Sequence, residues 1–148
     1  AWQYWNAASK NWVIGQSNAT PMAGVPAITN EYSVTRHTTA AGVFYMMTGM
    51  ETWSPRYPNW KNVVTYYSCT PVGPWTRRTI VYVTPESGAP GCSMGTLYTY
   101  NPKDHPEFAG ASGVLISYNV NANVGRDLVC ANDYVPRFIR VPIIGLIN

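Results

Sequence analysis

Apolar residues along the chain recur at short intervals and seldom at the spacing of a helix. Positions i, i+3, i+4 and i+7 are rarely apolar together, and Leu, Glu and Lys are scarce. Runs rich in Val, Ile, Thr and Tyr occur instead, each bounded by Gly, Pro, Asn or Ser, which is typical of antiparallel strands. The expected strands are Glu31–Arg36, Val43–Thr48, Asn62–Ser68, Arg78–Val83, Thr96–Tyr100, Gly113–Asn119 and Phe138–Val141, with shorter ones at Trp2–Trp5 and Trp12–Ile14.

Several of these strands carry apolar residues on both faces. In the strand at 62–68, Val63 and Tyr67 point to one face. Val64 and Tyr66 point to the other face. Strands covered on both sides favour radially stacked sheets over a two-layer sandwich, in which one face of each sheet meets water. We therefore expect an all-β fold of antiparallel β-propeller blades, with a self-contained sandwich or barrel as the alternative.

The spacing of the strands divides the 148 residues into groups of blade size. Residues 31–85 would form one blade, residues 96–141 the last blade, and residues 1–30 the outer strands of an earlier blade. A propeller needs at least four blades of about 40–50 residues each, so the chain would be a single partial domain of two to three blades. Missing N-terminal blades or an additional chain would complete the ring, because open blade faces expose apolar surface.

Composition and charge exclude several classes of protein. Hydrophobic residues make up 46% of the chain and charged residues 11%, which indicates a globular protein with a sparsely charged surface. The net charge is +3 and no basic run is longer than Arg77-Arg78, so nucleic acid is not an expected partner. The apolar run Val141–Ile147 is far shorter than the roughly 20 residues of a membrane-spanning helix, so no membrane span is expected.

Three features favour a secreted protein. The chain begins with Ala rather than Met, as a processed product would. The Asn-Ala-Thr sequence at 18–20 is a glycosylation sequon, and Lys and Glu are few. Cys69, Cys92 and Cys130 lack the spacing of a zinc site. They would form one disulfide with one leftover thiol, or three buried thiols.

Several motifs resemble those of known propellers. Residues 68–75 (SCTPVGPW) are similar to a turn that recurs in five-bladed propeller glycosidases that act on furanose polymers. HPEF at 105–108, GVLISYNVN at 113–121 and YVPRFIRV at 134–141 follow in order. This series resembles the last blade of a family of uncharacterised secreted propellers, some of which are similar to endo-D-arabinanases. At Val135, where relatives often carry Arg, the chain departs from the pattern.

The resemblance implies a five-bladed β-propeller of which this chain is the C-terminal part. Any active centre would lie in the axial channel, and His105 would face that channel. In furanosidase propellers the acidic catalytic residues come largely from early blades, which would lie upstream of Ala1.

Few residues of the chain suit acid–base chemistry. Glycoside hydrolysis generally needs two carboxyl groups, and the chain has only seven acidic residues. His105 and Glu107, beside Asp104 in a Pro-rich stretch that enters a strand, are the candidate catalytic residues. The alternative is a turn held by the side chain of Asp104, with His105 bonded to backbone carbonyls. His37, the other imidazole, is expected in a surface loop.

Two groups of residues suit substrate binding. Tyr118, Asn119 and Asn121 form a polar stretch that matches sugar hydroxyls, because amides both donate and accept hydrogen bonds. Trp53 and Trp60 lie in an expected long loop and could stack on sugar rings. Turn formation by the asparagines and blade capping by the tryptophans are the alternatives.

Motifs for other chemistries are absent from the sequence. It contains no GxSxG elbow, HExxH, P-loop or EF-hand loop, so no cofactor and no metal site are predicted. The resemblance to the propeller glycosidases implies a secreted, carbohydrate-active propeller domain, similar to glycoside hydrolases of furanose-containing polysaccharides, with a polysaccharide or other glycan as partner. A non-catalytic glycan-binding or structural module of the cell surface is the alternative.

Overall fold

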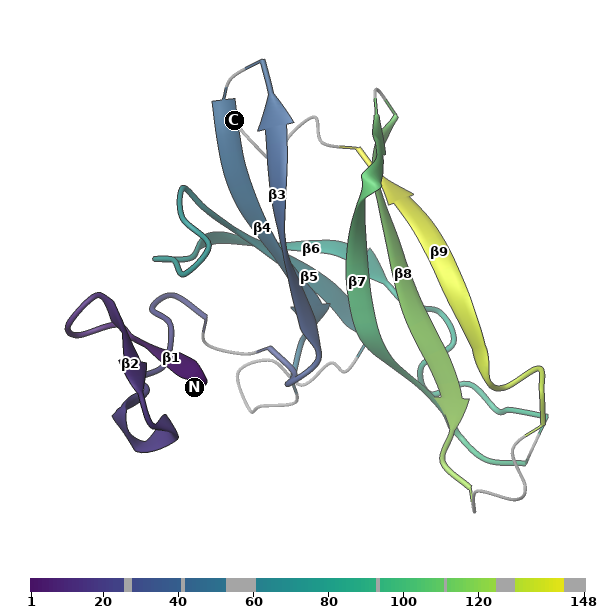
Figure 1. Ribbon diagram of the computed structural model, residues 1–148. Coiled ribbons are helices and arrows are strands. Elements are labelled where there is room, and N and C mark those ends of the chain that lie inside the picture. The colour runs from purple at the N-terminus through teal and green to yellow at the C-terminus, as the bar shows by residue number, and fades with distance from the viewer. Residues whose placement is uncertain are drawn as a thin grey trace.

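The computed structural model describes residues 1–25, 28–40, 42–52, 61–92, 94–110, 112–124 and 130–142. Within these residues the chain forms three antiparallel sheets and one short 3₁₀ helix (Figure 1). The N-terminal hairpin consists of β1 (Gln3–Asn6) and β2 (Asn11–Ile14), and is followed by the 3₁₀ helix η1 (Gln16–Asn18). The four-stranded sheet consists of β3 (Tyr32–Thr39), β4 (Gly42–Met50), β5 (Asn62–Ser68) and β6 (Thr76–Val83). The three-stranded sheet consists of β7 (Leu97–Gly110), β8 (Gly113–Ala122) and β9 (Val135–Val141).

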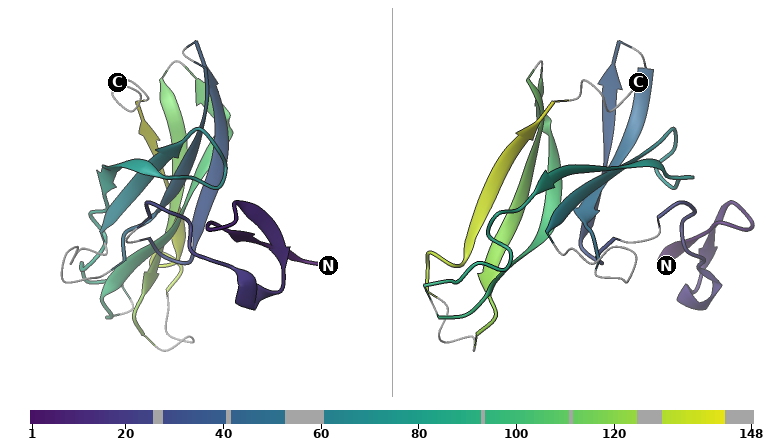
Figure 2. Two further views of the ribbon diagram at one scale, coloured as in Figure 1. Left: turned by 90° about the vertical axis from the view of Figure 1, so that its left-hand side faces the viewer. Right: turned by 180° about the vertical axis from the view of Figure 1, so that it is seen from behind.

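Each strand of the two larger sheets pairs with the next strand in sequence. The sheets lie beside each other, and β7 packs against β3 and β4 (Figures 1 and 2). A hydrophobic core fills the space between them and contains Met46, Met50, Val63, Tyr67, Val114, Ile116 and Val141. The antiparallel all-β class expected from the sequence is confirmed. The propeller arrangement and the blade boundaries at 1–30, 31–85 and 96–141 stay predictions.

The second face of the four-stranded sheet is covered by the chain that precedes it. This core contains Met47, Val64, Tyr66 and Trp75, packed by Met22, Val25 and Ile28. The backbone N–H of Trp75 donates to the carbonyl of Ala23 at 2.9 Å. Gly24 has a φ of +87°, and a Cβ there would overlap the carbonyl oxygen of Trp75, so the close approach requires glycine. Strand β5 is buried along its whole length, as its two apolar faces predict.

Strand β7 is longer than the sequence pattern predicts. It continues through Pro102 and Pro106 to Gly110, so the residues around His105 lie in a strand. Among the described strands, β7 pairs with β8 alone, and its register shifts next to both prolines, between Tyr100 and Lys103 and again after His105. Such edge positions and irregularities tolerate the missing N–H of proline. The alternative of a turn held by Asp104 is therefore wrong.

A disulfide joins Cys92 to Cys130, and Cys69 is exposed and free. This arrangement confirms the expectation of one disulfide with one leftover thiol. The bridge links the segment before β7 to the segment before β9. In the part of the chain that the structure describes, no helix has the length and apolar character needed to cross a membrane.

Removal of the disulfide is expected to destabilise the fold. The bridge closes a loop with a sequence separation of 38, for which loop-closure entropy predicts a loss of about 3–4 kcal/mol in the free energy of unfolding. We expect this loss for the double variant Cys92→Ser/Cys130→Ser in urea denaturation. Cys69→Ser is the matched control and should change stability by less than about 0.5 kcal/mol. Equal stability of all three proteins would contradict the prediction.

Candidate functional site

One face of the three-stranded sheet points away from the four-stranded sheet, and we call it the outer face. Along β8, Val114, Ile116, Tyr118, Val120 and Ala122 are buried. The intervening residues Leu115, Ser117, Asn119 and Asn121 are half-buried and lie on the outer face. The strand thus presents a hydroxyl and two amides at every second position on a partly exposed surface.

His105 stands on the outer face of β7, one strand away from these polar residues. Its Nε2 lies 2.7 Å from the Oγ of Ser117, and its Nδ1 lies 3.5 Å from the Oε1 of Glu107. The exposed rings of Phe108 and Phe138 flank the imidazole, at centroid distances of 6.5 and 6.3 Å. The structure therefore brings the two candidate catalytic residues into contact beside a pair of aromatic rings.

The two asparagines lie further along the same face, each beside a tyrosine of β7. Asn119 pairs with Tyr100 and Asn121 with Tyr98, and the two tyrosine rings are 5.5 Å apart. Among the described residues the side-chain amide of Asn119 has no hydrogen-bond partner, whereas Asn121 Oδ1 accepts from the backbone N–H of Ala122 at 2.8 Å. Asn119 therefore offers an unused donor and acceptor on a half-buried surface.

Tyr100 adds a neutral hydroxyl to this part of the face. Burial raises the pKa of Tyr100 to about 12, and a hydrogen bond with Tyr134 and nearby charge contribute in the same direction. The hydroxyl therefore stays protonated at neutral pH.

The other predicted binding residues are placed differently. Tyr118 is only 2% exposed and points to the inner face, where its hydroxyl donates to Glu86 at 3.0 Å. Burial, together with the hydrogen bond to Glu86, raises the pKa of Tyr118 well above its usual value. Tyr118 is a structural residue in this arrangement and does not share the face of Asn119. Trp53 and Trp60 lie outside the described residues.

A buried polar seam between β3 and β7 contains residues that the sequence analysis missed. Oδ2 of Asp104 accepts hydrogen bonds from Thr35 Oγ1 at 2.5 Å and from His37 Nε2 at 2.6 Å. The backbone N–H of Asp104 donates to Ser33 Oγ at 3.1 Å. The residues of β3 that take part are spaced two apart and share one face of that strand. One strand thus presents three polar groups to a single residue of the other sheet.

The prediction of His37 as a surface-loop residue is wrong. The side chain is 4% exposed, and the ring stacks on Phe44 with centroids 5.2 Å apart. Tyr67 borders the same region: burial raises its pKa to about 12, the Thr65 hydroxyl opposes this effect, and the charge of Asp104 adds to it. A sequence signal did exist, because Ser33, Thr35 and His37 recur at every second position and so form a polar row on one face of an expected strand.

The carboxylates that the structure describes here lie in separate environments. Glu51 binds Arg78 and accepts from Asn62 at 2.7 Å. Glu86 lies 3.3 Å from the Nε of Arg137. Asp104 and Glu107 are likewise paired with different imidazoles. Within the described ranges the contacts named here give these four acids no partner in common.

One group of residues in the described chain has ligand atoms close enough to hold a metal ion. It comprises Cys92, Cys130 and Asp133. The two sulfurs are joined to each other, and Asp133 Oδ1 accepts from the backbone N–H of Cys92 at 3.0 Å. In this structure the group therefore consists of a disulfide and a hydrogen bond that connect the segments before β7 and β9.

The seam gives a prediction about stability. Asp104→Asn removes the charge that His37 and Thr35 contact, and hydrogen bonds to a charged group typically contribute about 1.5–3 kcal/mol. We expect the free energy of unfolding in urea to fall by about this amount. Glu107→Gln, on the exposed side of the same strand, should change it by less than about 0.5 kcal/mol. Similar effects of the two substitutions would show that the seam does not hold the sheets together.

Comparison with known proteins identifies a family. The family described as Domain of unknown function (DUF5005) matches residues 1–143, which is nearly the whole chain. No curated protein and no solved structure matches the chain. The fold and the site geometry described above therefore belong to a member of the DUF5005 family.

Proposed function

We propose that this chain is part of an extracellular, propeller-type carbohydrate-active domain, and that it binds a glycan on the outer face. The observation that carries the proposal is the amide of Asn119, half-buried and unpartnered among the described residues, in a row with Ser117 and Asn121. The amide is partly exposed, so a polar ligand can reach it and bind both its donor and its acceptor. Sugar hydroxyls match it because they donate and accept in the same way as the amide does.

Aromatic rings frame this polar row at both ends. Phe108 and Phe138 are 59% and 60% exposed and lie beside His105. Tyr98 and Tyr100 lie beside the asparagines. The exposed phenylalanine rings can pack against the C–H face of a sugar while the amides bind its hydroxyls. The combination supports a glycan more than it supports a purely apolar partner.

The propeller arrangement is supported by how the two larger sheets meet. Each is an antiparallel meander, and the first strand of one, β3, packs beside the first strand of the other, β7. Exposed apolar side chains occur away from this junction, including Trp2 at 86% and Trp12 at 56%. Additional blades, from a longer polypeptide or another chain, would cover such surfaces. The disulfide and the exposed sequon asparagine, Asn18, support an extracellular location.

A catalytic form of this function rests on His105 and Glu107. Their contact at 3.5 Å places a carboxyl group and an imidazole next to the proposed sugar site. Hydrolysis of a furanose-containing polysaccharide needs a second carboxylate, and another blade would supply it. In that form Glu107 would exchange a proton with the sugar, and His105 would orient it.

Binding is tested most directly at Asn119. Asn119→Ala should weaken binding to an arabinan-type polysaccharide by about 2–10-fold, which is the loss expected for one or two hydrogen bonds. Affinity electrophoresis in gels that contain the polysaccharide measures this change. Asn11→Ala, which removes an exposed amide on the N-terminal hairpin, is the control and should leave mobility unchanged. If neither the wild-type protein nor the Asn11→Ala control is retarded by arabinan or by other plant and microbial polysaccharides, glycan binding on this face is refuted.

Catalysis is tested separately at Glu107. If the wild-type protein, with its complete set of blades, releases oligosaccharides from arabinan, Glu107→Gln should slow release by at least about 100-fold. Retardation in the polysaccharide gel should persist, because Glu107 is not in the row of amides. Product release is followed by chromatography. A wild-type protein that binds arabinan but releases no oligosaccharides contradicts the catalytic form and is consistent with a non-catalytic glycan-binding module.

A further inference from the structure

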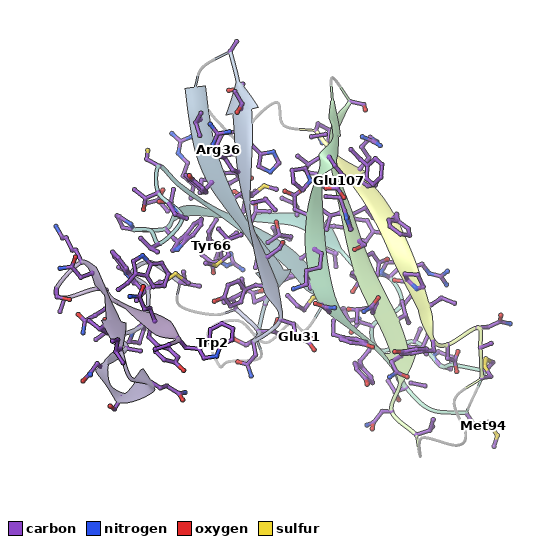
Figure 3. All side chains as sticks on the ribbon, in the orientation of Figure 1. Trp2, Glu31, Arg36, Tyr66, Met94 and Glu107 are labelled. Atoms are coloured by element: carbon purple, nitrogen blue, oxygen red, sulfur yellow. A yellow bond between two sulfur atoms is a disulfide. The ribbon has the colours of Figure 1, made fainter. Side chains whose placement is uncertain are left out.

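A hollow of about 350 Å³ opens between β3 and β7, beyond the polar seam. Residues 36–39 of β3 line one side, and Pro106, Ala109 and Gly110 of β7 line the other. In Figure 3, Arg36 and Glu107 mark the parts of the two strands between which this region lies. The volume falls in the range of small-ligand sites, about 300–1,000 Å³. Its walls combine threonine hydroxyls and a guanidinium group with small apolar residues.

His37 lines this hollow and is held in one orientation. Its Nε2 lies 2.6 Å from Asp104 Oδ2, and its ring stacks on Phe44 at an interplanar angle of 15°. The carboxylate of Asp104 is fully buried and accepts the bond, so the proton of a neutral His37 sits on Nε2. Nδ1 is then left with a lone pair and no proton.

The free lone pair determines which ligand the hollow suits. Among the described residues, no hydrogen bond reaches Nδ1 of His37. An unprotonated ring nitrogen accepts a hydrogen bond and repels an anion, and the buried negative charge of Asp104 behind it acts in the same direction. A neutral hydroxyl group satisfies the nitrogen. The hydroxyl of Thr38 and the guanidinium of Arg36 belong to residues that line the hollow and can bind further ligand oxygens.

We propose that this hollow is a second ligand site, which takes a neutral sugar whose hydroxyl group donates a hydrogen bond to Nδ1 of His37. The site is distinct from the outer face, because Asp104 and His105 point to opposite sides of β7. The choice of a sugar as the hydroxyl compound rests on the proposed function, whereas the state of His37 does not.

The first test measures the protonation pattern of the ring. Protein labelled with ¹⁵N-histidine is studied by long-range ¹H–¹⁵N correlation at about pH 8, where an ordinary imidazole is neutral. We expect His37 to carry its proton on Nε2. The signals of the two histidines are assigned with His105→Gln. A His37 ring protonated on Nδ1 overturns the proposal.

The second test adds probes to the same sample. D-arabinose, L-arabinose, D-galactose and D-glucose are titrated one at a time, with sodium sulfate as an anionic probe. At least one sugar should shift the Nδ1 signal of His37 in a saturable manner, and sulfate should not. A signal that no sugar moves, or that only sulfate moves, overturns the proposal.

A blocking variant makes the site assignment specific. Gly110 lines the hollow, and a Cβ at this position would have no atom within 4 Å. Gly110→Leu should therefore fold normally, keep the Nε2–H form of His37, and weaken the sugar-induced shift by at least about 10-fold. An unchanged shift in this variant places the sugar elsewhere and contradicts the proposal.

The two proposals fail independently. Asn119→Ala acts on the outer face and should not alter the response of His37, and Gly110→Leu should not alter retardation by the polysaccharide. Loss of polysaccharide binding with an intact His37 response would refute the outer face alone.

Discussion

The buried carboxylate of Asp104 is the contact on which the arrangement of the two larger sheets depends. A charge taken out of water costs several kcal/mol unless it is paired and hydrogen-bonded. Oδ2 of Asp104 meets this requirement with His37 and Thr35 in place, since both donate to it, whereas Oδ1 is buried and has no hydrogen-bond partner among the described residues. The surrounding apolar contacts, such as Met46 with Ile116, have no direction of their own. The polar seam therefore defines the register in which β3 meets β7.

Strand alternation then separates two kinds of surface on one element. Asp104 faces the seam, and its neighbour His105 faces outward to Ser117 and the phenylalanines. The same rule assigns Tyr118 to the interior and Asn119 to the outer face. A polar stretch that is continuous in sequence is thus divided between the buried interior and the half-buried outer face.

The sequence predicts the strands well because their residues are apolar on both faces and their ends carry Gly, Pro, Asn or Ser. It also locates His105, Glu107, Asn119 and Asn121, which lie together within one short sheet. It does not predict the pairing of His37, because the partner lies 67 residues away and becomes a neighbour only through sheet packing. The length of β7 was missed because prolines normally mark the end of a strand.

The prolines of β7 also affect how the protein behaves beside other exposed strands. The backbone N–H of Asp104 points toward β3. The N–H groups of residues two positions away along a strand point to the same side. At those two positions β7 has Pro102 and Pro106, which have no N–H to donate. The single N–H between them is bonded to Ser33. Between Pro102 and Pro106 this edge therefore lacks the row of free donors through which sheets fuse, which disfavours intermolecular strand addition along this part of β7.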